Sequence, residues 1–487
     1  MENKDSIQTN IDEALLNFKK AKYQISIDIL ESLEEKETNF LICWYLGHSY
    51  YRIYNYLTAI KYIKKSIILK GSDELNQSFL AEILLQSNQY EEAIKIFEKV
   101  LDINKKNVNA LFNLGKIYSE IGKFKTAEKY YNKITEEEPY NFNAFYELIK
   151  LDKEYLSDIL INNIKNFKVK DNKINLNNVY ASLILAENEK NNKNYDNELN
   201  NLINGHHYFI QNREKASEQE FNYFTNLLPQ FIKKTEDINF RSKSKNYPIF
   251  IMGLPRSGTT MIENLICSSE NNVIKGDETG VMGKVFFSKN IISNYDDNNL
   301  NVNFDFDDNG LQNLENLVIN QYKQVGIDTT KSFTDKSLEN FLYIKILSKI
   351  FPKAKFIYCK RNYTANLLGI LKVFLPNLLW SHSLEKIITF MELYENHLNE
   401  ILLEKKIDLK IVNLENFSEN PLDSSKNLFN FLGIKWNKKI IDENYNKTTI
   451  IKTVSNLQVR NKITKHDLSY LENYIPLLKK YGIKKLT

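Results

Sequence analysis

The stretch from 247 to 266, YPIFIMGLPRSGTTMIENLI, constrains the fold of this 487-residue chain more than any other segment. Its apolar run at 249–252 predicts a buried strand, a glycine-containing turn follows, and helical patterning opens at Thr259. Glycines let backbone N–H groups approach a ligand closely, and the positive end of a helix faces that ligand. Strand, turn and helix therefore predict an α/β domain with an anion-binding cradle.

The cradle differs from the loop that binds nucleoside triphosphates in kinases and NTPases. Gly253 and Gly258 match its frame G-x-x-x-x-G-K-[ST], but Thr259 stands where that loop has its lysine. The lysine normally brings positive charge to the β- and γ-phosphates. Here the cation is Arg256, inside the turn, which suits a ligand with one or two phosphate-like groups better than a triphosphate with magnesium.

A period of 34 residues runs through the N-terminal part of the chain. Ala59, Ala93 and Ala127 recur at this interval, and small and aromatic residues keep the same register. The matching positions are Gly47, Ala81 and Gly115, and Tyr56, Tyr90 and Phe124. A 34-residue period with small side chains where two helices meet is typical of tetratricopeptide repeats, which stack into an all-α solenoid. A concave groove for a protein or peptide partner is the expected use.

The remaining organisation follows from where the period ends. We predict the tetratricopeptide array over 1–142, a helical cap and connector over 143–245, and an α/β domain with a parallel sheet over 246–487. An Asn/Lys-rich segment at 188–197 is expected to form a solvated turn or loop. In the α/β domain, strands are expected at 249–252, 355–359 and 409–414, and helices at 338–350 and 384–402.

Composition narrows the class of protein. A net charge of +4 is too small to indicate binding to nucleic acid or to a membrane. Three isolated cysteines predict reduced core thiols, and His206-His207 has no carboxylate or cysteine at metal-ligand spacing. The first ten residues carry no apolar signal region, and no run of about 18 apolar residues occurs. We therefore expect a cytoplasmic protein without a metal or a membrane anchor.

The PRSGTT turn resembles the 5′-phosphosulfate-binding loop of sulfotransferases. These enzymes take a sulfuryl group from 3′-phosphoadenosine 5′-phosphosulfate (PAPS) and release 3′-phosphoadenosine 5′-phosphate (PAP). This form of the loop is similar to that of the branch containing protein-tyrosine sulfotransferases and bacterial proteins that join tetratricopeptide repeats to a sulfotransferase domain. The resemblance implies PAPS as the cofactor, and it implies that the loop residues bind it. These residues are Pro255, Arg256, Ser257, Gly258, Thr259 and Thr260.

Two further segments resemble catalytic motifs of that family. KGDETG is similar to its Gly-Glu-Glu-Thr motif, which implies that Glu278 is the base that takes the proton of an acceptor hydroxyl, with Asp277 as the rival. TDKSLENF is similar to its DKxPxN motif, with Leu338 in place of the proline. The resemblance implies that Lys336 contacts the transferring sulfuryl group, as Arg256 does, and that Asn340 helps to build the site.

The segment KFIYCKRN resembles the part of the family that binds the 3′-phosphate. Arg361 matches its arginine, which can grip a phosphate through two N–H groups. Gly369 stands in place of the usual serine, and Tyr363 in place of a proline. Three explanations stay open for Gly369: its backbone N–H replaces the hydroxyl, affinity for the 3′-phosphate is reduced, or the site takes a different donor.

The C-terminal segment TVSNLQVR resembles the family's TxSxxQVR. This implies that Ser455 contacts the 3′-phosphate region of PAPS and that Arg460 and Lys462 line the rim. Asp467 stands near the place of a later tryptophan of the family. Trp380 and Tyr394 fit the pattern as core residues.

Three functions are compatible with these features. The first is a PAPS-dependent sulfotransferase whose repeats present an acceptor, which is a protein tyrosine, a carbohydrate or a small alcohol. The second is an interaction protein whose sulfotransferase domain is degenerate, favoured by Gly369, Tyr363, Leu338 and Asp467. The third is a P-loop kinase or NTPase, which the missing lysine disfavours.

Overall fold

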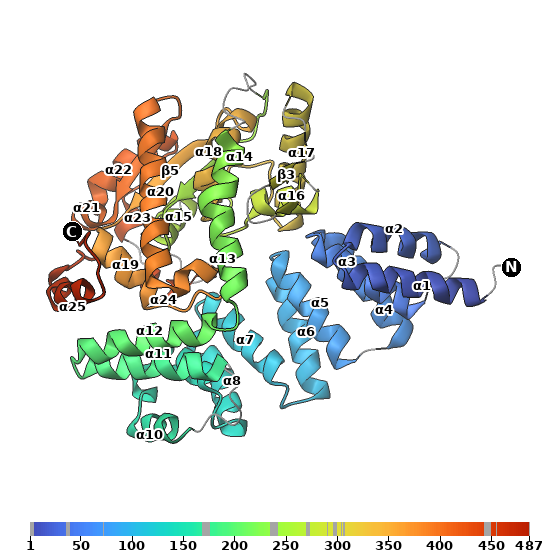
Figure 1. Ribbon diagram of the computed structural model, residues 1–487, viewed down its shortest axis with the longest axis horizontal. Helices are drawn as coiled ribbons and strands as arrows, with labels where there is room; N and C mark the ends of the chain where they lie inside the picture. Colours follow the sequence, from blue (N-terminus) through green and yellow to red (C-terminus); the bar gives the residue numbers. More distant parts are fainter. Residues whose placement is uncertain are drawn as a thin grey trace.

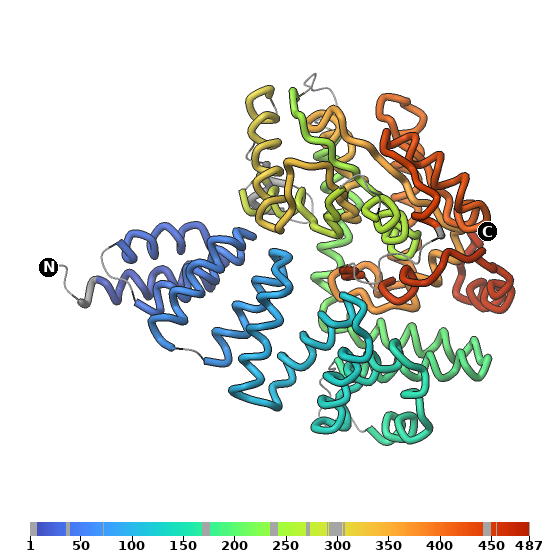
Figure 2. The backbone as a smooth tube through the Cα atoms, turned by 180° about the vertical axis from the view of Figure 1, so that it is seen from behind, coloured from blue at the N-terminus to red at the C-terminus, as the bar shows by residue number. Residues whose placement is uncertain are grey.

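The computed structural model describes residues 4–35, 39–71, 73–167, 176–233, 242–268, 273–289, 291–295, 300–302, 304, 307–442, 450–453 and 455–486. The chain forms a helical array, a helical connector and an α/β domain (Figure 1). Figure 2, from the opposite side, shows that the array and the α/β domain lie against each other. No helix in the described part of the chain is both long and apolar enough to cross a lipid bilayer.

The array is a stack of antiparallel helix pairs. Its helices are α1 (Lys4–Lys19), α2 (Tyr23–Glu34), α3 (Phe40–Arg52), α4 (Tyr56–Lys70), α5 (Glu74–Gln86), α6 (Tyr90–Ile103), α7 (Val108–Glu120) and α8 (Phe124–Glu137). The small residues lie where the paired helices come closest. A Cβ on Gly47 would lie 2.4 Å from Cδ1 of Ile63, and one on Gly115 would lie 2.6 Å from Cε1 of Tyr131. The predicted solenoid is confirmed, with packing as the reason for its period.

The turn inside each helix pair contains one residue in the left-handed region. Tyr54, Asn88 and Gly122 have φ of 60°, 61° and 81° and lie in the same register of successive repeats. The repeat therefore places these turns in a row along one edge of the array. That edge faces the α/β domain, because Asn88 Nδ2 donates to the carbonyl of Val325 over 2.7 Å and Gln321 Nε2 donates to that of Tyr54 over 3.1 Å.

The connector continues the helical pattern. It contains α9 (Phe142–Leu151), η1 (Lys153–Tyr155), α10 (Asp158–Asn166), α11 (Leu176–Asn191), α12 (Tyr195–Ile210), α13 (Glu214–Asn222), η2 (Tyr223–Leu227) and α14 (Leu228–Lys233). The turn or loop expected at 188–197 is present but short: it lies at 192–194, because α11 runs to Asn191 and Asn194 caps α12 by accepting from the N–H of Asn197. Nδ1 of His206 lies 2.8 Å from Nδ1 of His382, so this histidine joins the connector to the α/β domain.

The α/β domain is built on a parallel sheet. Its strands are β1 (Pro248–Met252), β4 (Phe333–Asp335), β5 (Lys355–Lys360) and β6 (Leu409–Asn413), in the order β4-β1-β5-β6. Phe250 pairs with Asp335 on one side and with Phe356 on the other. A separate antiparallel pair, β2 (Ile292–Tyr295) with β3 (Leu300–Val302), lies outside this sheet.

Helices cover both faces of the sheet. They are α15 (Thr259–Cys267), α16 (Val281–Ser288), α17 (Asp308–Gln324), α18 (Asn340–Ile350), α19 (Tyr363–Leu371), η3 (Leu379–His382), α20 (Leu384–Glu404), α21 (Leu414–Glu419), α22 (Pro421–Leu432), α23 (Lys439–Asp442), α24 (Asn456–Val459), η4 (Ser469–Asn473) and α25 (Ile475–Lys480). Alternate residues of β1 enter different clusters: Phe250 and Met252 one, Ile249 and Ile251 the other.

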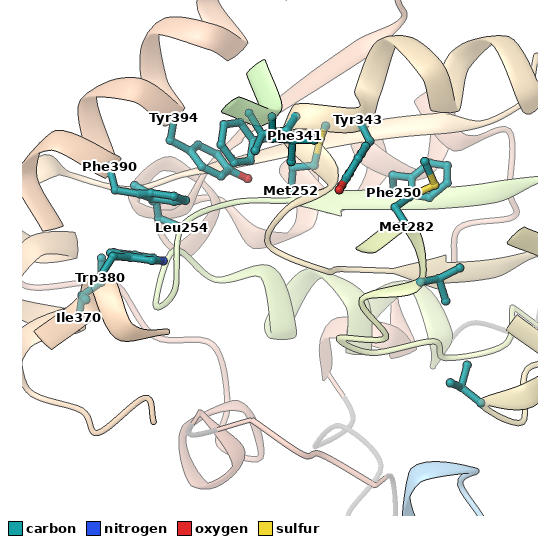
Figure 3. Close-up of a cluster of buried hydrophobic side chains, with 14 of the residues drawn as sticks. Phe250, Met252, Leu254, Met282, Phe341, Tyr343, Ile370, Trp380, Phe390 and Tyr394 are labelled. Carbon is teal, nitrogen blue, oxygen red and sulfur yellow. The ribbon is translucent and has the colours of Figure 1, made fainter. Parts of the chain in front are cut away.

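The larger cluster is rich in aromatic rings (Figure 3). The Trp380 ring stacks on Phe390 with 4.1 Å between centroids, and Phe341 lies 4.0 Å from Tyr394. Trp380 and Tyr394 are fully buried, which confirms the prediction that both are core residues. The three predicted strands are also confirmed, whereas β4 is not among the predicted strands.

Candidate active site

The carboxyl ends of the parallel strands open on one side of the sheet, where ligands of such folds bind. The turn after β1 is held tightly there. A Cβ on Gly253 would lie 2.3 Å from Ser257 Oγ and 2.9 Å from the carbonyl of Cys359, so only glycine fits. Arg256 has φ of 70° and Gly258 has φ of 95°. Left-handed backbone at a non-glycine residue is strained and persists where neighbours fix it.

Helix α19 and the residue Arg361, which follows β5, supply the groups that fix this turn. Asn366 Nδ2 donates to the carbonyl of Pro255 over 2.7 Å, and Arg361 Nη1 donates to the carbonyl of Arg256 over 2.9 Å. Gly369 allows the close approach, since a Cβ there would lie 3.1 Å both from Arg256 Cβ and from Arg361 Nη1. Gly369 lies inside α19, where a backbone N–H bonds to the carbonyl four residues earlier. The helix therefore does not leave that N–H to replace a serine hydroxyl.

Arg256 and Arg361 form an electropositive pair. In the described part of the chain no carboxylate lies within 4.0 Å of either guanidinium, and Nε of both is buried without a hydrogen-bond partner, as is Ser257 Oγ. Burial, and then the charge of Arg361, lower the pKa of Arg256 to about 10. Two unneutralised arginines with spare buried donors fit an anionic ligand of the phosphate type.

The second group of charges surrounds Lys336. Its Nζ lies 2.5 Å from Asp277 Oδ1 and 2.9 Å from Glu278 Oε1, and its side chain is fully buried. The Asp277 side chain is 10% exposed, whereas that of Glu278 is 59% exposed. Burial disfavours ionised Asp277, but Lys336, together with Lys275 and Lys452, outweighs burial, and the pKa of Asp277 falls to about 2. Asp277 is therefore a buried ion-pair partner, and Glu278 is the acid that a ligand can reach.

Asp335, at the end of β4, organises the neighbouring loops. Its Oδ1 accepts from Ser337 N over 2.8 Å and from Asn340 Nδ2 over 3.0 Å, and its Oδ2 accepts from Tyr322 OH over 2.6 Å and from Thr279 Oγ1 over 3.0 Å. Asn340 thus builds the site by holding Asp335. The hydrogen bonds fix the positions of Lys336 and of the segment that carries Glu278.

Glu339 is an acid that sequence reasoning did not single out. Its Oε1 lies 3.2 Å from the position that a Cβ on Gly280 would take, and it lines the same cavity as Glu278. Burial raises the pKa of Glu339 to about 7. The local sequence around Glu339 does not mark it as a buried acid of the cavity, because the residues that bury it are distant in sequence.

The cavity has a volume of about 2130 Å³. Arg256, Arg361 and Gly369 line one part, Glu278 and Lys336 another. The array and the connector complete the wall, with Tyr54, Tyr56, Glu120, Tyr146 and Tyr180. Pockets for a single small ligand usually measure about 300–1,000 Å³. This cavity has room for a nucleotide and for part of a second molecule.

Two parts of the chain match models of known protein families. Residues 248–438 match the model of the sulfotransferase family, and residues 84–149 match the model of the tetratricopeptide repeat. The α/β domain is a sulfotransferase-family domain.

Curated relatives match parts of the chain. A TPR repeat-containing protein of Methanocaldococcus jannaschii is 33% identical over 103 residues, which are 21% of this chain and 18% of that protein. An uncharacterized protein of Aquifex aeolicus is 24% identical over 274 residues, 52% of this chain and 34% of that protein. This chain therefore matches about a third or less of the length of either relative.

Solved structures similar to this chain include two tetratricopeptide repeat proteins. The C-terminal part of a TPR repeat-containing protein from Cytophaga hutchinsonii is 20% identical, covers 42% of this chain and 90% of its own, and has a TM-score of 0.33. YrrB, described as a TPR protein with an unusual peptide-binding site, is 18% identical, covers 34% and 86%, and has a TM-score of 0.29.

Most residues expected at the site of the sulfotransferase domain lie around this same cavity. Pro255, Gly258, Thr259 and Thr260 line it, and Ser455 Oγ accepts a hydrogen bond from Arg256 Nη1. Arg460 is different. Its Nη2 donates to the carbonyl of Glu120 over 2.6 Å, so its guanidinium points to the repeat array. No group of three or more metal-ligating side chains occurs among the described residues.

Gly276 allows a test of how closely the segment that carries Glu278 packs against the end of β4. A Cβ there would lie 1.7 Å from the carbonyl oxygen of Thr334. We expect Gly276→Ala to lower the free energy of unfolding by about 1–3 kcal/mol or more, as overpacking does. Gly283→Ala is the matched control, since its nearest neighbour would be Glu339 Oε1 at 3.9 Å. Equal stability of the two variants in chemical denaturation would contradict this close packing.

Proposed function

We propose that the protein transfers a sulfuryl group from PAPS to a hydroxyl acceptor bound in the cavity. The observation that carries the proposal is the unneutralised pair Arg256 and Arg361 beside the exposed acid Glu278 and its partner Lys336. Sulfuryl transfer needs cations, N–H donors and one base, and it needs no metal. These groups line one cavity at the carboxyl edge of the sheet.

The positions of the residues suggest which part of PAPS each would bind. Pro255, Ser257, Gly258, Thr259 and Thr260, with the positive end of α15, would hold the 5′-phosphosulfate. Arg361 would hold the 3′-phosphate, next to Gly369, and Ser455 lies at the same end through its bond to Arg256. PAPS, when bound, supplies the sulfuryl group and a phosphate leaving group.

Glu278 is the base that best suits the geometry. Its carboxylate reaches the cavity, whereas Asp277 is buried against Lys336. Glu278 takes the proton of the acceptor hydroxyl as the oxygen becomes nucleophilic. Lys336 and Arg256 stabilise the negative charge of the transferring group. The size of the cavity leaves room for an acceptor residue of a protein, a sugar or a small alcohol, and the tyrosine-sulfotransferase branch remains part of this proposal.

One observation favours the second candidate, an interaction protein with a degenerate domain. Gly369 brings no hydroxyl to the 3′-phosphate region, and Arg361 already spends one Nη1 bond on the carbonyl of Arg256. Loss of a hydrogen bond to a charged group such as phosphate costs roughly 1.5–3 kcal/mol in affinity. This would weaken PAPS binding without removing the rest of the site.

Calorimetric titration with PAP separates the two candidates. We expect the wild-type protein to bind PAP, and Arg361→Ala to weaken binding by roughly 10- to 100-fold, as expected for losing a charge-assisted bond to phosphate. Magnesium–ATP is the control ligand, and thermal unfolding checks that the variant is folded. Absence of PAP binding by the wild type would contradict the proposal, and binding of magnesium–ATP alone would support a kinase.

A further inference from the structure

One short segment of the sulfotransferase domain lies between the repeat array and the cradle. We call residues 450–453 and 455–460 the strap; it contains α24. On the cradle side, Arg256 donates from Nη1 to Ser455 Oγ and from Nη2 to Gln458 Oε1. Thr453 Oγ1 lies 3.1 Å from Thr260 Oγ1. The strap thus fixes the side chain of the one arginine inside the PRSGTT turn.

On its other side the strap is bound to the end of helix α7. Ile451 N donates to the carbonyl of Glu120 over 2.9 Å, and Arg460 Nη2 donates to the same oxygen over 2.6 Å. Asn456 Nδ2 donates to the carbonyl of Ser119 over 2.7 Å. The last carbonyls of a helix have no partner within the helix, and a cation is favourable at that end. The strap therefore satisfies the carbonyl of Glu120, which α7 leaves open, and adds a bond to the carbonyl of Ser119, which also accepts from the N–H of Gly122.

Asn456 and Arg460 also bond to each other. Arg460 Nε donates to Asn456 Oδ1 over 2.8 Å, and the Arg460 guanidinium lies 5.8 Å from the ring centre of Phe124 in α8. Both side chains are directed to the repeat array, while Ser455 and Gln458 of the same helical turn are directed to Arg256. The single turn of helix α24 therefore links the repeat array to Arg256.

Further contacts join the array to the domain. Besides the contacts of Tyr54 and Asn88, the N–H of Leu57 donates to Gln324 Oε1 over 3.0 Å. A Cβ on Gly326 would lie 2.5 Å from the carbonyl of Ser87, so the backbones of these two segments are in contact. Lys452 of the strap donates to Asn88 Oδ1. Turns in successive repeats thus hold the domain at several points.

We propose that the repeat array is a working part of the PAPS site, and that Asn456 and Arg460 are positioning residues that tie α7, through Ser455 and Gln458, to Arg256. This inference rests on the proposed function, since it concerns how the chain holds PAPS. It assigns to the repeats a role beyond recruitment of an acceptor. A change in α7 is transmitted to the cradle through the strap.

The test is a double-mutant cycle read out as PAP affinity by calorimetry. We expect Asn456→Ala to weaken PAP binding about tenfold, the effect of losing a positioning hydrogen bond. In an Arg256→Ala background the same substitution should change affinity by less than about twofold, because coupled residues are not additive. Lys125→Ala, an exposed change on α8, is the control and should leave affinity unchanged.

Arg460 gives a second arm if Asn456→Ala fails to fold. Arg460→Lys keeps a cation at the end of α7 and should retain more PAP affinity than Arg460→Ala. In the ligand-free protein, hydrogen exchange of the amides at 455–460 should be faster in Arg460→Ala than in the wild type.

Each outcome is decisive. Equal PAP affinity of the wild type and Asn456→Ala overturns the inference alone, as does an additive cycle, which would mean a purely structural effect. Unchanged exchange in Arg460→Ala also overturns it. A wild-type protein that binds no PAP overturns the proposed function and the inference together.

Discussion

Glu278→Gln is expected to lower turnover by roughly 100- to 10,000-fold, the usual contribution of a general base. PAP affinity should stay within about threefold of the wild type, because glutamine keeps the shape of the side chain and Glu278 belongs to the acceptor side of the cavity. Initial-rate kinetics with PAPS, together with PAP calorimetry, would measure both quantities.

Two neighbouring acids serve as comparisons for Glu278. Asp277→Asn tests the rival acid, which is buried against Lys336. Glu339→Gln tests another acid that lines the cavity, whose pKa of about 7 would also suit a base. A larger loss of turnover in either of these folded variants than in Glu278→Gln would contradict the assignment of Glu278.

Lys336→Met is expected to have the largest effect on stability. It leaves buried Asp277 without its cation, and breaking a buried pair costs about 3–5 kcal/mol. Lys355→Met is the matched control, because its 3.0 Å pair with Asp408 has exposed fractions of 34% and 67%, and such a solvent-accessible pair is worth at most about 1 kcal/mol. Chemical denaturation measures both. Equal losses would contradict a buried, paired Lys336.

The same variant should change the pH dependence of stability. In the wild type, Asp277 has a folded pKa of about 2, below its ordinary value of 3.8, so its stabilising effect is present above pH 3.8 and is lost as pH falls towards 2. In Lys336→Met the charge of Lys336 is lost, and burial, opposed by the charges of Lys275 and Lys452, raises the pKa of Asp277 above its wild-type value. The deficit of the variant should therefore be greatest near neutral pH and shrink towards pH 4. A deficit that stays constant would contradict this pairing.

Local patterns predicted the main elements of the fold. Apolar runs marked β1, β5 and β6, and the 34-residue period marked the array, because core faces impose their own spacing. The strand Phe333–Asp335 has only three residues, two of them polar, so no local pattern distinguishes it. Only its pairing with β1 shows that it is a strand of the sheet, at the edge next to the site.

The site residues likewise fall into those that a local sequence pattern predicts and those that it does not. The residues of the PRSGTT turn could be named from sequence because one local structure, strand to turn to helix, brings them together. The roles of Asp335 and Arg460 depend on partners far along the chain, Tyr322 in α17 and Glu120 in α7. The exposure that separates Glu278 from Asp277 is likewise a property of tertiary packing.

Transfer of radiolabelled sulfur from PAPS is the most direct test of catalysis. Wild-type protein and Glu278→Gln would be incubated in parallel with labelled PAPS and a cell extract as the source of acceptors. We predict label in an acceptor with the wild type, an equal amount of PAP formed, and neither with Glu278→Gln. A wild-type protein that binds PAP but transfers no label would contradict the enzyme and support a nucleotide-binding interaction protein.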